Sequence, residues 1–158
     1  MRSEDRGWDE CVGPVLSSVL DLAPHDAVAN VAAFLGGMQQ TIASWAPMVA
    51  KFVNGNDQMK LGVWMAAITE LERYCLQESR SAMAPYFGYA LQFIWENDIV
   101  TNEAMEKWAE MRKTLDAGDP IAALFNQPTS QRLLASMNEE SSSGSGSGSG
   151  SDTDSDEE

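Results

Sequence analysis

Apolar side chains recur every three or four residues along most of this chain, and that spacing places them on one face of an α-helix. The clearest segment runs from Leu61 to Leu76. No segment shows the alternating β-branched pattern that is typical of a strand. We therefore expect an all-α protein. In the clearest segment the apolar stripe comprises Trp64, Ile68, Leu71 and Cys75, whereas Glu70, Glu72 and Arg73 fall mostly elsewhere.

Glycines and prolines divide this pattern into short helices. Gly36-Gly37 is expected to separate two helices, and Pro47 should kink the later one or mark its start. The predicted helices cover residues 9–21, 26–38, 40–53, 61–76, 85–97, 101–115, 121–125 and 129–137. The short loops between them predict antiparallel pairs in one domain over residues 1–140, either as stacked pairs or as an irregular bundle.

Capping residues fix several helix starts in the second half of the chain. Thr101 or Asn102 is expected to cap the helix that carries Glu103 in its first turn. Asp119 followed by proline predicts another start, and Thr129 or Ser130 can cap the last helix.

Residues 141–158 contain no apolar side chain, so they cannot offset the entropy lost on ordering. We expect a disordered tail of Gly, Ser, Asp and Glu. Three hydroxyl residues in it are followed three positions later by an acid, a spacing that suits an acidophilic kinase. These candidate phosphorylation sites are Ser151, Thr153 and Ser155.

The chain carries a formal net charge of -14. Because affinity for nucleic acid depends on Lys and Arg that neutralise phosphates, we expect no direct nucleic-acid ligand, and a basic protein partner fits better. The longest nearly uncharged stretch, 28–53, has too many polar residues and glycines for a bilayer span, and no secretory signal is apparent. Cys11 and Cys75 lack a metal or redox spacing, which indicates reduced thiols and a cytoplasmic location.

Signatures of enzymes are missing from the sequence. The single histidine, His25, has no second histidine for a metal and no nucleophile arrangement nearby, so a capping or surface role is expected. Gly36-Gly37 is not followed by the Gly-Lys-Ser/Thr ending of a phosphate-binding loop. We expect neither a metal nor a cofactor, and no covalent chemistry.

The segment Leu91–Glu110 combines aromatic residues with five carboxylates and one lysine, Lys107. Two interpretations of the carboxylates remain at this point: a solvated helix face, or a surface that holds a basic partner. Exposed helix faces ordinarily mix charges of both signs, which favours the second interpretation. For the aromatics, a place in the core is favoured over ligand contact.

This segment resembles the first aromatic/acidic box of the W-two domain at the C-termini of eukaryotic translation initiation factors. Residues 42–52, with Trp45-Ala46-Pro47, and the helix that follows at Val63–Glu78 are similar to the Trp-Ser-Pro segment of the epsilon subunit of initiation factor 2B. Initiation factor 5 shares the domain type. The resemblance covers about residues 30–141.

The resemblance implies a HEAT-like stack of antiparallel helix pairs without a cofactor. It also implies binding to the lysine-rich segment of the beta subunit of initiation factor 2, GDP release from the gamma subunit, and contact with other exchange-factor subunits. The partner-binding residues that carry over are Glu96, Asp98, Glu103, Glu106, Trp108 and Glu110, with Glu139 and Glu140 from a second box.

Two departures from the family pattern bear on this function. In the second box, Leu133 or Leu134 stands where an aromatic residue is expected. The N-terminal helices are incomplete relative to the epsilon domain, and no residue here matches its catalytic glutamate. The alternatives are therefore an acidic adaptor or competitor that binds basic partners without exchange activity, and a helical scaffold unrelated to translation.

Overall fold

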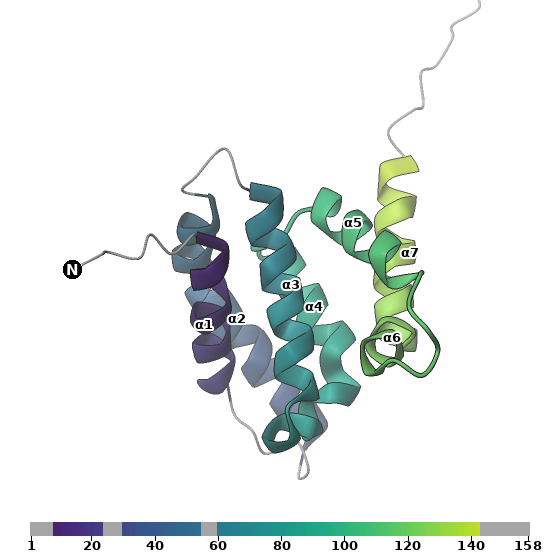
Figure 1. The fold of residues 1–158 in the computed structure, drawn as a ribbon. Helices are drawn as coiled ribbons and strands as arrows, with labels where there is room; N and C mark the ends of the chain where they lie inside the picture. The colour runs from purple at the N-terminus through teal and green to yellow at the C-terminus, as the bar shows by residue number, and fades with distance from the viewer. Residues whose placement is uncertain (1–7, 24–29, 55–59, 143–158) are drawn as a thin grey trace, which may run out of the picture.

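The computed structural model describes residues 8–23, 30–54 and 60–142, and every regular element within these ranges is helical (Figure 1). The all-α prediction is confirmed. Seven α-helices and one 3₁₀ segment follow one another in these ranges: α1 (Trp8–Asp21), α2 (Val31–Asn54), α3 (Lys60–Leu76), η1 (Glu78–Tyr86), α4 (Phe87–Glu96), α5 (Asn102–Arg112), α6 (Pro120–Phe125) and α7 (Pro128–Ser142).

Helix α3 occupies the middle of the molecule and contacts α1 on one side and α5 on the other (Figure 1). Helix α2 packs on α1 and α4, and α7 packs on α4 and α5. One hydrophobic core runs through these contacts, with Leu16, Leu71, Leu91 and Trp108 fully buried within it. The HEAT-like arrangement of helix pairs stays a prediction.

Helix α2 is continuous where the sequence predicted a break. Gly36-Gly37 lies inside it, because Phe34, Met38 and Ile42 keep the helical spacing across the glycines and are almost completely buried. Burial of three such side chains stabilises the helix by more than the roughly 1 kcal/mol that a glycine costs. Pro47 also lies within the helix and marks no boundary.

The starts of the helices agree better with the sequence. The Thr101 side chain accepts a hydrogen bond from the backbone N–H of Ala104 at 3.4 Å, and Asp119 accepts one from Ile121 at 2.8 Å. Asn30 caps α2 by accepting from Ala33 at 3.1 Å, so this helix begins later than predicted. His25 lies outside the described residues.

The ends of several helices differ from the prediction. Helix α7 begins at Pro128, ahead of the predicted cap, and continues to Ser142, beyond its predicted end at Met137. Helix α5 ends at Arg112, three residues earlier than expected. The 3₁₀ segment η1 was not predicted, and it delays the start of α4 to Phe87. Helix ends depend on weak local signals, and this is why they are the least predictable feature.

Candidate partner-binding surface

Three predicted site residues follow one side of α5. Glu103, Glu106 and Glu110 are all exposed, at the spacing i, i+3 and i+7. Lys107 Nζ lies 3.4 Å from a carboxylate oxygen of Glu110, but both side chains are more than half exposed, so water weakens this ion pair. The side of α5 therefore keeps an excess of negative charge.

Beside these acids, a groove of about 400 Å³ runs between α5 and α7. Glu106, Glu110 and Lys113 contribute its charged groups. We call this feature the acidic groove; the other residues that line it are Ala109, Phe125, Gln131, Leu134, Ala135, Met137 and Asn138. A lining that is half apolar and includes two carboxylates can hold a lysine side chain by both its alkyl stem and its ammonium group.

Two further predicted acids lie at a separate hollow of about 560 Å³, at the turn from α4 to α5. Glu96 and Asp98 line it together with Trp95 and Asn102. Trp95 Nε1 donates to Asn102 Oδ1 at 2.6 Å and so ties the end of α4 to the start of α5. The structure thus places Glu106 and Glu110 at one hollow and Glu96 and Asp98 at another.

The turn itself has a defined backbone. Asp98 has a φ of 57°, in the left-handed region that favours glycine. Its N–H donates to the Trp95 carbonyl at 3.1 Å, and the N–H of Ile99 donates to the Ile94 carbonyl at 3.0 Å. These two bonds form a Schellman motif, which ends α4 and holds the Asp98 carboxylate at the surface.

Trp108, another predicted contact residue, lies in the core and not on this surface. Its side chain has no exposed area, and its ring packs edge-on against Phe125 with the ring centroids 5.4 Å apart. Its Nε1 donates to a carboxylate oxygen of Glu72 at 2.7 Å. A direct contact between the Trp108 ring and a partner is therefore ruled out in this structure, and the residue instead anchors α5.

The sequence did not identify the bonding partner of Trp108. Glu72 is 1% exposed and lies 2.6 Å from Arg112, whose side chain is 11% exposed. The hydrogen bonds that Arg112 donates to this carboxylate raise the pKa of Arg112. Glu72 follows Ile68 by four residues, so its spacing already placed it beside the apolar stripe of α3. That spacing is the sequence signal that could have identified Glu72 as a buried residue.

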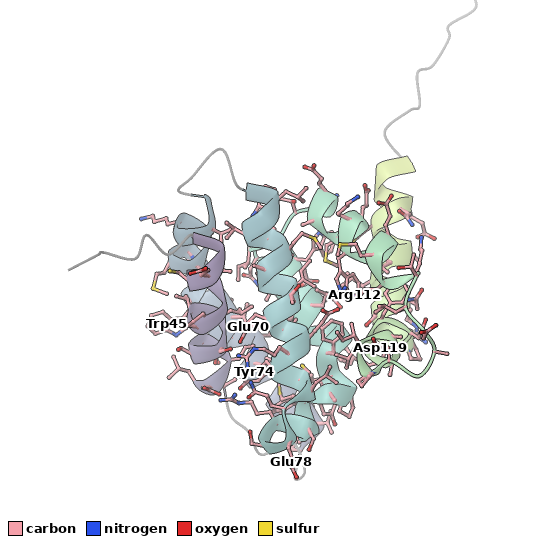
Figure 2. All side chains as sticks on the ribbon, in the orientation of Figure 1. Trp45, Glu70, Tyr74, Glu78, Arg112 and Asp119 are labelled. Carbon is pink, nitrogen blue, oxygen red and sulfur yellow. The ribbon has the colours of Figure 1, made fainter. Side chains whose placement is uncertain are left out.

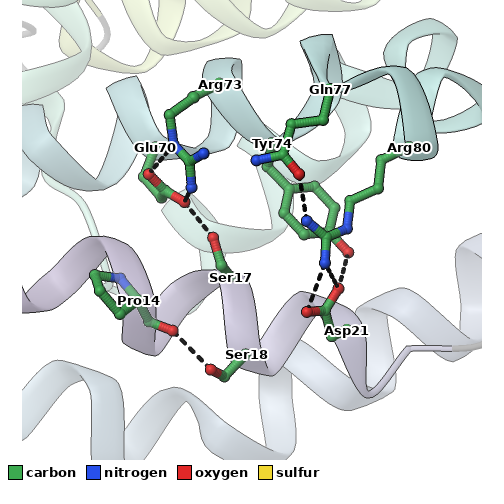
Figure 3. A network of polar contacts seen from close by, with 9 residues as sticks. All are labelled: Pro14, Ser17, Ser18, Asp21, Glu70, Arg73, Tyr74, Gln77 and Arg80. Atoms are coloured by element: carbon green, nitrogen blue, oxygen red, sulfur yellow. Dashed lines mark hydrogen bonds and ion pairs between the residues drawn. The ribbon is translucent and has the colours of Figure 1, made fainter.

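A second polar network joins α3 to α1 (Figure 3). Glu70 accepts hydrogen bonds from Ser17 and from Arg73, the latter at 2.7 Å from Arg73 Nε. Burial opposes ionisation of Glu70, but the bonds from Arg73 and Ser17 outweigh it and lower its pKa. A few residues further along α3, the Tyr74 hydroxyl donates to Asp21 at 2.8 Å.

The Asp21 carboxylate also pairs with Arg80, at 2.5 Å, and the Arg80 guanidinium lies over the Tyr74 ring, 4.3 Å from its centroid. Burial, together with the bond to Asp21, raises the pKa of Tyr74. These bonds run within and between α1, α3 and η1. The network around Glu72 and the network around Glu70 and Asp21 therefore both hold helices together.

Chemically reactive groups are few in the described part of the chain. No group of three or more His, Cys, Asp or Glu residues in it could hold a metal ion. Cys11 and Cys75 are free thiols. Burial, with a smaller contribution from the Glu72 charge, raises the pKa of Cys75 to about 12, so this thiol is protonated and unreactive near neutral pH.

Comparisons with protein-family models, curated proteins and solved structures found no match to this chain. Membership of the W-two family therefore stays a prediction from the residues. Among the helices of the described ranges, none has the length and apolar character that crossing a bilayer requires. Glu139 is exposed on α7, whereas the side chain of Glu140 and the candidate phosphorylation sites Ser151, Thr153 and Ser155 lie outside the described residues.

Proposed function

We propose that this chain acts in the cytoplasm as a domain of a translation initiation factor. In this proposal its acidic groove binds the lysine-rich segment of the beta subunit of initiation factor 2. The acidic groove is the observation that carries the proposal, because its lining combines the carboxylates of Glu106 and Glu110 with apolar side chains. Glu103 extends the charge along α5, and Glu139 adds an exposed acid on α7.

Lysine-rich segments suit this arrangement for two physical reasons. Carboxylates near an apolar lining attract the ammonium group while the alkyl stem of lysine covers apolar surface. The net charge of -14 also attracts a basic partner over a distance, which raises the rate of encounter. The electrostatic part of both contributions weakens with salt, since the Debye length falls to about 3 Å at 1 M.

The same docking would contribute to GDP exchange on the gamma subunit. A protein accelerates nucleotide release without making a bond when it binds the nucleotide-free state more tightly than the nucleotide-bound state. In this account the groove holds the beta subunit and so brings the exchange factor close to the gamma subunit and to other exchange-factor subunits.

An adaptor or competitor that binds basic segments without exchange is the second candidate. The two buried glutamates of the described ranges favour it, because both are committed to bonds inside the fold. Glu70 bonds to Ser17 and Arg73, and Glu72 bonds to Trp108 and Arg112. Neither is presented to a partner as a catalytic group.

A paired measurement tests both candidates: affinity for a lysine-rich peptide over a series of salt concentrations, and the rate of GDP release from initiation factor 2. We expect binding that weakens steadily with salt. Absence of binding even at low salt would contradict both candidates. Binding without faster GDP release would leave the adaptor and remove exchange.

The double substitution Glu103→Lys plus Glu106→Lys locates the binding surface. Both side chains are exposed, so the fold should persist while peptide affinity falls by about tenfold or more, equivalent to roughly 1.4 kcal/mol. A matched control, Glu10→Lys plus Glu78→Lys, makes the same change of net charge at exposed positions of α1 and η1. An equal loss in both variants would show that overall charge, not the groove, governs binding.

A further inference from the structure

The end of the molecule formed by α1 and α2 exposes large apolar side chains. Leu22 is 61% exposed, Trp45 41% and Met48 45%. Figure 2 shows Trp45 on the outer side of this end, away from α5 and α7. A groove of about 340 Å³ adjoins these side chains, and Pro14, Val15, Ser18 and Val19 complete its lining. We call Leu22, Trp45, Met48 and this groove the apolar face.

The surroundings of the apolar face carry very little charge. Residues 11–20 of α1 and 31–50 of α2 contain no charged side chain, although both helices have sides exposed to solvent. A solvated helix ordinarily has charged residues on its exposed side. Contiguous exposed apolar surface of this kind marks a site of association.

The hydroxyl group at this groove would not resist burial. Ser18 is the one residue of its lining with a hydroxyl group, and that hydroxyl already donates to the Pro14 carbonyl at 2.7 Å (Figure 3). Covering the groove would therefore leave the Ser18 hydroxyl bonded, so burial of this hydroxyl would cost little.

Segments of the chain outside the described ranges are poor candidates to cover the apolar face. Residues 1–7, 24–29, 55–59 and 143–158 contain no aromatic residue, leucine or isoleucine. Their composition offers little apolar surface to match Trp45 and Leu22. These segments therefore give no reason to place any of them on the apolar face, and another molecule fits it better.

The distribution of charge favours a second copy of this chain as that molecule. Within the described ranges, residues 96–142 carry a net charge of -5, and the residues before them carry -2. Helices α5 and α7, which belong to residues 96–142, lie at the opposite end from α1 (Figure 1). Two copies that meet through α1 and α2 keep their acidic ends far apart, whereas contact through the acidic groove would bring like charges together.

We propose that the apolar face pairs with the same face of a second copy in a two-fold symmetric dimer. In such an interface each residue meets its reciprocal counterpart, so an apolar side chain that protrudes beside an apolar groove can complement itself. Trp45 protrudes and the α1 groove receives it. The acidic groove stays open to a basic partner in each copy.

Sedimentation of the full chain over a wide range of protein concentration tests the dimer, with a matched pair of substitutions. Met48→Lys places a charge in the apolar face, and Met111→Lys places one on α5, where the methionine is almost equally exposed, at 46%. We expect a reversible dimer that Met48→Lys weakens by about tenfold or more, roughly 1.4 kcal/mol, and that Met111→Lys leaves intact. Added salt should strengthen the dimer, because it screens the repulsion between the acidic chains.

Three results would overturn the proposal: a monomer at every concentration, a dimer that Met111→Lys disrupts while Met48→Lys does not, or a dimer that neither affects. Circular dichroism checks the fold of each variant. If Met48→Lys loses helical content, Leu22→Lys, at the more exposed position, decides the question in its place. Peptide binding by Met48→Lys should be unchanged, so failure of the dimer and failure of the acidic groove are separately visible.

Discussion

The two ends of this molecule use charge in opposite ways, and two glutamates on α3 show the difference. Toward α1, Glu70 shares its carboxylate with Ser17 and with Arg73, whose side chain is 59% exposed. Toward α5, Glu72 is sealed in the core with Trp108 and Arg112. The end that carries the acidic groove contains the deeply buried Glu72–Arg112 pair, whereas the Glu70–Arg73 pair at the α1 end lies near water.

This difference predicts unequal costs for removing the two glutamates. Glu72→Ala should lower the free energy of unfolding by roughly 3–5 kcal/mol, because Arg112 is left charged and largely buried without a partner. Glu70→Ala should cost about 1 kcal/mol, since Arg73 can turn to water. Urea denaturation followed by circular dichroism measures both. Equal losses in the free energy of unfolding would mean that the two glutamates stabilise the fold equally.

Glycines give a second comparison of the two ends. A Cβ at Gly88 of α4 would lie 2.6 Å from Thr129 Cβ and 2.7 Å from the Ser130 backbone nitrogen on α7. A Cβ at Gly36 of α2 would meet nothing within 4 Å. The close approach of α7 to α4 therefore depends on the absence of a side chain at Gly88.

We expect Gly88→Ala to destabilise the protein by about 1–3 kcal/mol, because α7 must shift away from α4. Gly36→Ala should instead stabilise it by about 0.5–1 kcal/mol, since alanine is less flexible in the unfolded chain. Thermal melts of the two variants beside the parent chain test this pair. A loss of stability in Gly36→Ala would contradict the continuous α2 helix.

The dependence of stability on pH should reveal the network at the α1 end. The pKa of Glu70 is lowered in the folded state, so its contribution is present above the unfolded value of about 4.3 and is lost as pH falls through the folded pKa. The parent chain should be more stable than Glu70→Gln at pH 7, and the difference should shrink below about pH 4.3. Denaturation at a series of pH values measures it, with Glu10→Gln as the surface control. Parallel curves for the parent chain and Glu70→Gln would contradict this assignment.

The sequence predicted correctly the features that depend on residues close together along the chain. Thr101 and Asp119 act as caps within two or three residues of their bonding partners, and both were identified. Gly36-Gly37 was wrongly assigned as a break, because burial of Phe34 and Met38 overrides a local preference. Helix propensity does not include the tertiary contacts that form only in the folded chain.

Distant contacts account for the site residues that the sequence could not place. Glu72 pairs with Trp108 and Arg112, which lie 36 and 40 residues further along the chain. The acids of α5 were correctly expected to be exposed, but the groove beside Glu106 exists only because α7 crosses nearby. Grouping residues into a site requires helix packing, which periodicity alone does not determine.

The smallest predicted effect concerns Asp98, an acid that opposes local stability at the acidic end. It has a left-handed backbone at the C-terminus of α4, where glycine is favoured and where the helix dipole disfavours a negative charge. Asp98→Gly should raise the free energy of unfolding by about 0.5–1 kcal/mol. Asp98→Asn, which removes only the charge, should give part of that gain. If the carboxylate serves partner binding, both variants should bind the lysine-rich peptide more weakly while they unfold at higher denaturant concentration. A variant that gains stability without losing affinity would exclude Asp98 from the binding surface.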